Sequence, residues 1–272
     1  MENILFVIIH HSNNDTHTNA LLRCLESIRR IYPKNTIIIC KTSVSPISNV
    51  FDKYENIEYI NTPHDNSHVY GAMFLLNKLL IQHETDFIFV NNQRHYTDFI
   101  LLHDSIVMIK SLDNSILLQN FYFLWHFNDF KMDYENYFIE LLQFSKLNVE
   151  QRQQIFDMYQ KDNNVKWTGV FGPMFGGKIE VLKNIIDKMG INTTFLEYVS
   201  SREQLEVAER YISCFVSFLD IVKPNTSLND SIFKQPNAFT YTNFLNLDEI
   251  LLLTTETKYD GYFYKLWYGR QI

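Results

Sequence analysis

Apolar residues follow one another without interruption in three short stretches near the start of the chain. These stretches are ILFVIIH (4–10), TIIIC (36–40) and IEYIN (57–61). Continuous apolar runs of this length predict strands that are covered on both faces, as in a parallel sheet. FILLHDSIVMI (99–109) adds a pattern of strand, break and strand.

Between the first strands, apolar residues recur at spacings of three and four, which is typical of an amphipathic helix. One such helix is expected over the positions from Ala20 to Ile31, with Thr18 or Asn19 as its cap and a proline two residues beyond its end. A second helix is expected over about 69–83.

The second half of the chain mixes both patterns. The expected elements are a strand pair or one long strand over 116–127, helical structure over 134–160, a strand, loop and helix over 167–186, and a helix over 200–222. Ser200 or Ser201 would cap the last helix, with Glu203 or Gln204 near the capping-box position. Residues 86–92 fit a strand or the end of a helix equally well.

The alternation of strands and helices predicts an α/β fold, with a mainly parallel sheet flanked by helices. No linker or repeat divides the chain, so we expect one domain over residues 1–272. Ligands of such sheets bind at the carboxyl ends of the strands. The loops at these ends are 10–18, 41–49, 62–68 and 103–106.

Composition narrows the classes of function. The chain is 46% hydrophobic and 15% aromatic, which is enough for a large core, and its net charge of −7 argues against a nucleic-acid partner. Three scattered cysteines and the absence of a leader or a long apolar run favour a soluble, cytoplasmic protein without a membrane span. The abundance of Asn, Ile, Phe and Tyr is typical of an AT-rich genome, such as that of a protist or a large DNA virus.

Several common chemistries lack their motifs in this sequence. No GxGxxG follows the first strand, no GxxxxGK[ST] or GxSxG is present, and the histidines and cysteines do not form HExxH or CxxC. The usual dinucleotide, P-loop, hydrolase and structural zinc sites are therefore not expected.

Three segments together resemble the GT-A glycosyltransferases, in particular the inverting enzymes of family two. They are FILLHDSI (99–106), at the place of the acidic DXD motif, GVFGPMFGGKIEVL (169–182) and SSREQLEVAER (200–210). The resemblance implies a GT-A-like, Rossmann-like fold with a nucleotide-sugar-binding half (1–110), and an acceptor half with a C-terminal segment (111–272). It also implies an enzyme that moves a sugar from a nucleotide donor to a glycan or protein acceptor, with inversion.

The resemblance places Asp104 at the donor diphosphate, where a carboxylate would hold Mn²⁺ or Mg²⁺. His103 and Ser105 stand where the family has acidic residues, which makes the DXD motif degenerate and leaves the need for a metal open. Asp104 could instead simply cap a turn.

Other donor-binding residues follow from the same resemblance. Expected around the nucleotide are His10, His11, Ser12, Lys41, Asn66 and Gly71. Lys265 and Arg270 near the C-terminus are an alternative counter-charge for the phosphates. Each of these residues also has a purely structural interpretation, in the core or in solvent.

The acceptor hydroxyl must lose its proton, which in inverting enzymes falls to a carboxylate. Glu203 is the preferred base, with Glu206 and Glu209 further along the same helix; a retaining enzyme would need none of them. The acceptor would contact Trp167, Gly172, Met174 and Gly176, of which Trp167 fits the core equally well.

Two other functions remain open on the sequence. A nucleotidyltransferase would share the sheet, but HSNNDTHT (11–18) is not a glycine-rich basic loop. A catalytically inactive glycosyltransferase-like module that binds a sugar or a protein would be consistent with the degenerate acidic motif.

Overall fold

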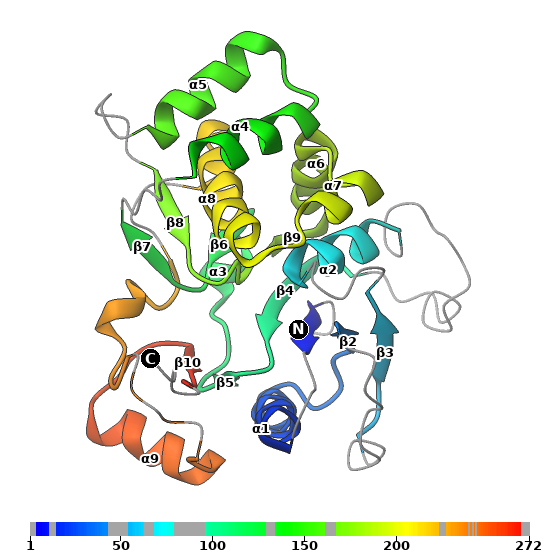
Figure 1. The fold of residues 1–272 in the computed structure, drawn as a ribbon. Helices are drawn as coiled ribbons and strands as arrows, with labels where there is room; N and C mark the ends of the chain where they lie inside the picture. The colour runs from blue at the N-terminus through cyan, green and yellow to red at the C-terminus, as the bar shows by residue number, and fades with distance from the viewer. Residues whose placement is uncertain are drawn as a thin grey trace.

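A computed structural model describes most of the chain. The described residues are 4–10, 15–42, 54–62, 68–78, 96–128, 134–160, 167–222, 227–238, 240, 242 and 244–267. The predicted element at 86–92 lies outside them. The predicted α/β class is confirmed: the described part contains a six-stranded mixed sheet, mostly parallel, with helices on both faces (Figure 1).

The sheet has the strand order β3-β2-β1-β4-β9-β6. Its strands are β1 (Ile4–His10), β2 (Ile37–Lys41), β3 (Ile57–Asn61), β4 (Asp98–His103), β6 (Phe121–Phe123) and β9 (Phe175–Lys178). β1 pairs in parallel with β2 and β4, and β2 with β3, whereas β9 runs antiparallel between β4 and β6. All seven residues of β1 are buried, as its continuous apolar run predicts.

Two apolar layers sandwich this sheet. On one face, α1 (Asp15–Ile31) packs against alternate residues of β1, such as Phe6 and Ile8. On the other face, the intervening residues Leu5 and Val7 meet a larger layer of helices. Side chains of successive strand residues point to opposite faces, so each strand contributes to both layers and ties them into one core.

The larger helical layer follows from the amphipathic patterns of the second half of the chain. It comprises α2 (His68–Leu76), α4 (Glu135–Phe144), α5 (Val149–Tyr159), α6 (Ile179–Met189), α7 (Thr193–Tyr198) and α8 (Arg202–Phe218). In Figure 1, α4 to α8 lie on the side of the sheet opposite α1. The predicted capping box of α8 is confirmed, because Gln204 N donates to Ser201 Oγ at 3.2 Å and Ser201 N donates to Gln204 Oε1 at 2.9 Å.

The remaining elements are short. A helical turn α3 (Asn114–Leu117) precedes β6, and β7 (His126–Asn128) pairs with β8 (Thr168–Val170). β5 (Ile106–Met108) leaves the main sheet and pairs antiparallel with β10 (Phe263–Lys265), which brings the C-terminal region back to the strand that follows β4. A 3-10 turn η5 (Ile232–Lys234) and α9 (Leu247–Glu256) complete the described chain.

Several predicted boundaries were wrong. α1 begins at Asp15, so Thr18 and Asn19 lie inside it rather than capping it; an acidic residue in the first turn favours that earlier start. Residues 116 and 117, which were expected in a strand, lie instead in the helical turn 114–117. The helical region 134–160 is two helices, because Asn148 caps a new one through a bond from Gln151 N.

β9 was not expected as a strand inside the sheet. It holds two adjacent glycines, and at Gly177, whose φ is +153°, an added Cβ would lie 2.4 Å from the carbonyl oxygen of Asn120. Glycine therefore permits the close approach of β9 to the chain before β6. None of the helices in the described part of the chain has the length and apolar character needed to cross a membrane.

Candidate functional site

The order of the strands identifies the place along the sheet where a ligand site is expected. From β1 the chain moves outward to β2 and β3, and then returns to place β4 on the other side of β1. Ligands of open α/β sheets bind at such a reversal, outside the carboxyl ends of the strands. At this point β1 ends in His10 and β4 ends in His103, with Asp104 in the turn that follows.

His10 and Asp104 join the two strand ends. His10 Nδ1 and Asp104 Oδ2 lie 2.7 Å apart, and Asp104 N donates to the carbonyl oxygen of Ile9 at 3.1 Å. The His10 side chain is buried, whereas that of Asp104 retains 13% exposure. A carboxylate in contact with one imidazole nitrogen fixes the orientation of the ring, which leaves its second nitrogen available for another partner.

Lys265 reaches the same turn from β10. Its amino group donates to Ser105 Oγ, and Leu266 N donates to the carbonyl oxygen of Ser105 at 2.8 Å. The residue keeps some surface exposed, but burial of its amino group lowers the Lys265 pKa to about 8, an effect that the nearby Asp104 carboxylate partly offsets. Gln235 holds the Lys265 backbone from both sides, at 2.7 and 2.8 Å.

Lys41 ends β2 and is the register partner of His10. Paired residues of neighbouring strands point to the same face, so Lys41, His10 and Asp104 share the face covered by α1. Lys41 is buried, and no described residue gives its amino group a hydrogen-bond acceptor or a counter-charge. We call Lys41, His10, Asp104, Ser105 and Lys265 the strand-end cluster.

The strand-end cluster alone does not fit a divalent metal ion. Mn²⁺ and Mg²⁺ prefer several oxygen ligands, and Asp104 is the one carboxylate in the cluster, with one oxygen already bonded to His10. Among the described residues, no three His, Cys, Asp or Glu side chains come together as a potential metal site. The metal role of Asp104 therefore stays a prediction.

His103 points to the opposite face of the sheet, where it meets the glycine-bearing loop after β8. Its Nε2 lies 2.8 Å from the carbonyl oxygen of Gly172, which has a φ of +56°. The strand β8, which leads into this loop, is tied to α8, because Val170 N donates to Ser213 Oγ and Ser213 Oγ donates to the carbonyl oxygen of Glu209. A continuous set of contacts thus connects the end of β4 with the middle of α8.

The three candidate glutamates of α8 have different surroundings. Glu203 is fully exposed, and its pKa is lowered by its own backbone N–H and by Ser201. Glu206 is bonded to the exposed Arg202 at 3.0 Å. Glu209 is 26% exposed, pairs with Arg210 at 3.3 Å and lies near Tyr70. Its carboxylate therefore lies close to a buried residue of another helix, α2.

Tyr70 lies in the first turn of α2, the next described element after β3, so the Glu209 carboxylate lies near the start of α2. Burial raises the pKa of the Tyr70 phenol well above its usual value, and the Glu209 carboxylate raises it further. Tyr70 Oη is buried, and no described residue forms a hydrogen bond with it. The Glu209 carboxylate therefore lies near a buried hydroxyl group that has no described hydrogen-bond partner.

Most of the predicted acceptor residues are in the core instead of facing a ligand. Trp167 is 3% exposed and packs on Phe127, and Met174 is 1% exposed. At Gly176 an added Cβ would lie 2.6 Å from the Tyr122 ring, so this glycine makes room for Tyr122 rather than for an acceptor. For Trp167 this burial matches the core interpretation, and the acceptor role of the three residues stays a prediction; of the four, Gly172 alone keeps partial exposure.

Some predicted donor residues remain untested. His11, Ser12, Asn66 and Arg270 lie outside the described residues. Gly71 is buried in α2, which matches its structural interpretation. Sequence reasoning missed three residues near the site: Cys24, whose Sγ faces the carbonyl oxygen of His103, Gln235 and Tyr70.

Comparison with known proteins leaves the site to be interpreted on its own chemistry. No protein-family model matches the chain, and none of the curated proteins searched matches it.

Proposed function

We propose that this chain is a glycosyltransferase with a GT-A-like fold, which transfers a sugar from a nucleotide-sugar donor to a glycan or protein acceptor with inversion. One observation carries the proposal: the strand-end cluster lies where the strand order reverses between β1 and β4. That position is the general ligand site of open α/β sheets.

The charges of the cluster suit a diphosphate. Lys41 and Lys265 contribute two amino groups, and the described residues of the cluster include one carboxylate, Asp104. Negative charge accumulates on the leaving diphosphate as the bond between sugar carbon and phosphate oxygen breaks, and fixed cations stabilise that charge. Asp104 orients His10, whose second ring nitrogen is free to hydrogen-bond a donor oxygen.

The acceptor side is assigned to the other face of the same edge. We assign the base to Glu209 rather than to the preferred Glu203, because Glu203 is fully exposed whereas Glu209 lies beside Tyr70. In the proposed step, the acceptor oxygen forms a bond to the sugar carbon, its proton passes to the Glu209 carboxylate, and the nucleoside diphosphate leaves with the bonding electrons.

Donor binding tests the proposal directly. Uridine, guanosine and cytidine diphosphate sugars would be screened by thermal shift, with and without Mn²⁺. A donor at a hundredfold excess over its Kd stabilises the protein by about 2.7 kcal/mol, and we expect one class of base to give this shift. Asp104→Asn should abolish it, whereas Asp187→Asn, the same change at an exposed residue of α6, should not.

Two outcomes would contradict the proposal. If no nucleotide sugar shifts the melting temperature, or if Asp104→Asn leaves the shift intact, the strand-end cluster is not a donor site. Binding without any release of free nucleotide, even with acceptor mixtures present, would instead identify a sugar-nucleotide-binding module without transferase activity.

A further inference from the structure

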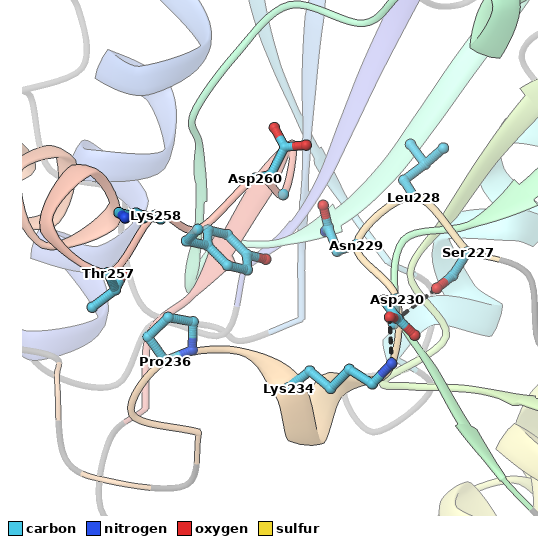
Figure 2. A pocket seen from close by; sticks show the side chains of 11 residues that line it. Ser227, Leu228, Asn229, Asp230, Lys234, Pro236, Thr257, Lys258 and Asp260 are labelled. Atoms are coloured by element: carbon cyan, nitrogen blue, oxygen red, sulfur yellow. Dashed lines mark hydrogen bonds and ion pairs between the residues drawn. The ribbon is translucent and has the colours of Figure 1, made fainter.

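A second hollow lies away from the strand-end cluster, in the C-terminal part of the chain. It has a volume of about 710 Å³, is open to the surface, and is lined by residues of two segments, 227–236 and 257–261. Figure 2 shows side chains of both segments around the same space, with Asn229 between Asp260 and Asp230. Volumes of about 300–1,000 Å³ are typical of small-molecule sites. We call this space the C-terminal hollow.

Asn229 gives the floor of the hollow a donor that has no described partner. Its side chain is 6% exposed, and its Oδ1 accepts from Tyr262 N at 2.6 Å and from Phe263 N at 3.2 Å. These two bonds fix which end of the amide is the nitrogen. Nδ2 is buried, and no described residue accepts a hydrogen bond from it. A buried N–H donor that lines a hollow is suited to an oxygen atom of a ligand.

The charges at the rim are already balanced. Asp230 Oδ2 bonds Lys234 at 2.6 Å, and Asp260 Oδ1 bonds Lys110 at 2.5 Å. These lysines lower the pKa of both carboxyl groups, so both ion pairs stay charged at neutral pH. The opposite charges of each pair largely cancel, so the two pairs add little net charge to the hollow. One further lysine, Lys258, is exposed. A ligand with a high charge of either sign would have to displace one of the pairs.

The rest of the lining combines an aromatic ring with small polar groups. Tyr259 is partly buried in the wall, Leu228 and Pro236 add apolar surface, and Ser227 and Thr257 add hydroxyl groups. An aromatic ring, a few amide and hydroxyl groups, and paired charges match a molecule with hydroxyl edges and C–H faces.

We infer that the C-terminal hollow binds a neutral carbohydrate. Asn229 Nδ2 would donate to a ring or hydroxyl oxygen, Tyr259 would pack on a C–H face, and the Asp230 carboxylate would accept from a hydroxyl group. The inference does not depend on the proposed transferase chemistry. The wall of the hollow and the strand-end cluster are nevertheless connected, since Gly261 and Lys265 are four residues apart and at most about 14 Å from each other.

The test measures binding rather than activity. The full chain would be titrated calorimetrically with maltotriose, cellotriose, chitotriose and mannotriose, and with inorganic phosphate as a charged probe. We expect at least one saccharide to bind, and Asn229→Asp to weaken it about tenfold, because the oxygen acceptor remains while the N–H donor is lost. Asn192→Asp is the matched control: its Oδ1 also accepts a backbone N–H, from Phe195, but at an exposed position outside the hollow.

A second variant avoids the buried floor. Asp260 is 97% exposed, so Asp260→Cys should fold normally, and the native cysteines 24, 40 and 214 are all buried. Coupling a bulky maleimide at this position should abolish saccharide binding, while the unlabelled variant retains it. The inference is overturned if none of the four saccharides binds, if phosphate alone binds, or if the labelled protein binds as well as the unlabelled one.

Discussion

At the scale of single residues, the protonation state of Lys265 should control the donor site. Burial lowers its pKa from 10.5 to about 8, and the Asp104 carboxylate partly offsets this effect. A lysine carries its charge below its pKa, so its attraction for a diphosphate is present below about pH 8 and is lost as pH rises through that value. We expect the affinity for the nucleotide sugar to fall above pH 8, by up to about tenfold per pH unit.

The variant Lys265→Arg separates this cause from other alkaline effects. Arginine stays protonated throughout this range, so the affinity of the variant should be nearly constant from pH 7 to 9.5 in the same titrations, whereas Lys265→Met should be weak at every pH. A wild-type affinity that does not change over this range would show that the Lys265 charge takes no part in donor binding.

The choice between the glutamates of α8 also belongs to this scale. Glu209→Gln keeps the size of the side chain but removes the base, so kcat should fall by about 10²–10⁴ while KM changes little. Glu203→Gln makes the same change at a fully exposed residue of the same helix and should leave kcat nearly unchanged. Steady-state rates of both variants, measured with the nucleotide sugar that binds, would identify the base. If kcat falls in Glu203→Gln and not in Glu209→Gln, the base is Glu203, as the sequence predicted.

The candidate site could be predicted only where it depends on local sequence. His10, Lys41 and Asp104 follow continuous apolar runs, so their place at the carboxyl edge of the sheet is readable from the pattern. The contact between Ser105 and Lys265 joins residues 160 positions apart. It depends on the pairing of β5 with β10, which no local pattern specifies, and this also explains why Gln235, which bonds Lys265, was missed. Tyr70 was missed for a similar reason, because its neighbour Glu209 belongs to a helix far away in the sequence.

At the scale of elements, the end of α9 illustrates a conflict between residue type and backbone. The helix ends at Glu256, and Lys258 adopts a left-handed conformation with a φ of 52°. Tyr259 N donates to the carbonyl oxygen of Thr254 at 2.8 Å, in a helix-ending turn that usually has glycine at the left-handed position. A side chain with a Cβ is disfavoured in this conformation by about 1–2 kcal/mol.

Lys258→Gly should therefore stabilise the protein. The gain is reduced by the greater freedom of glycine in the unfolded chain, which leaves up to about 1 kcal/mol, or about 2–4 °C in Tm for a chain of this size. Lys258→Ala keeps the Cβ and serves as the control, which should not gain stability. Equal melting temperatures for the two variants would contradict the assigned strain.

Some helices and strands could be predicted from the sequence, and others could not. β1 and α8 were predicted because each has a long, uniform pattern, and the capping box marks the start of α8. The strand β9, with the sequence FGGK, has neither length nor β-propensity. It is a strand because its glycines allow close approach to the chain around β6, which is a property of the packed sheet and not of the segment.

At the scale of the whole molecule, the apolar clusters of the core differ in size. The layers on the two faces of the main sheet share β1, β2 and β4, so neither can open without exposing the other. A third cluster, formed by Val107, Ile250, Tyr264 and Leu266, joins α9 to β5 and β10 and is far smaller. α9 contributes only two buried side chains to the fold, Ile250 and Thr254, while Leu252 is 58% exposed.

This difference predicts two classes of amide exchange. Amides of β1 and β4 should exchange only by global unfolding, whereas those of α9 should exchange by a local opening of lower free energy, since little apolar surface is exposed when α9 detaches. Hydrogen exchange read by mass spectrometry on the unliganded protein would measure both, and equal protection in α9 and β1 would contradict the prediction.

Because the segment after α9 forms one wall of the C-terminal hollow, a saccharide bound there should slow exchange in α9 and leave β1 unchanged. This slowing should be lost in Asn229→Asp and retained in Asn192→Asp, so the same experiment connects the low stability of α9 to ligand binding.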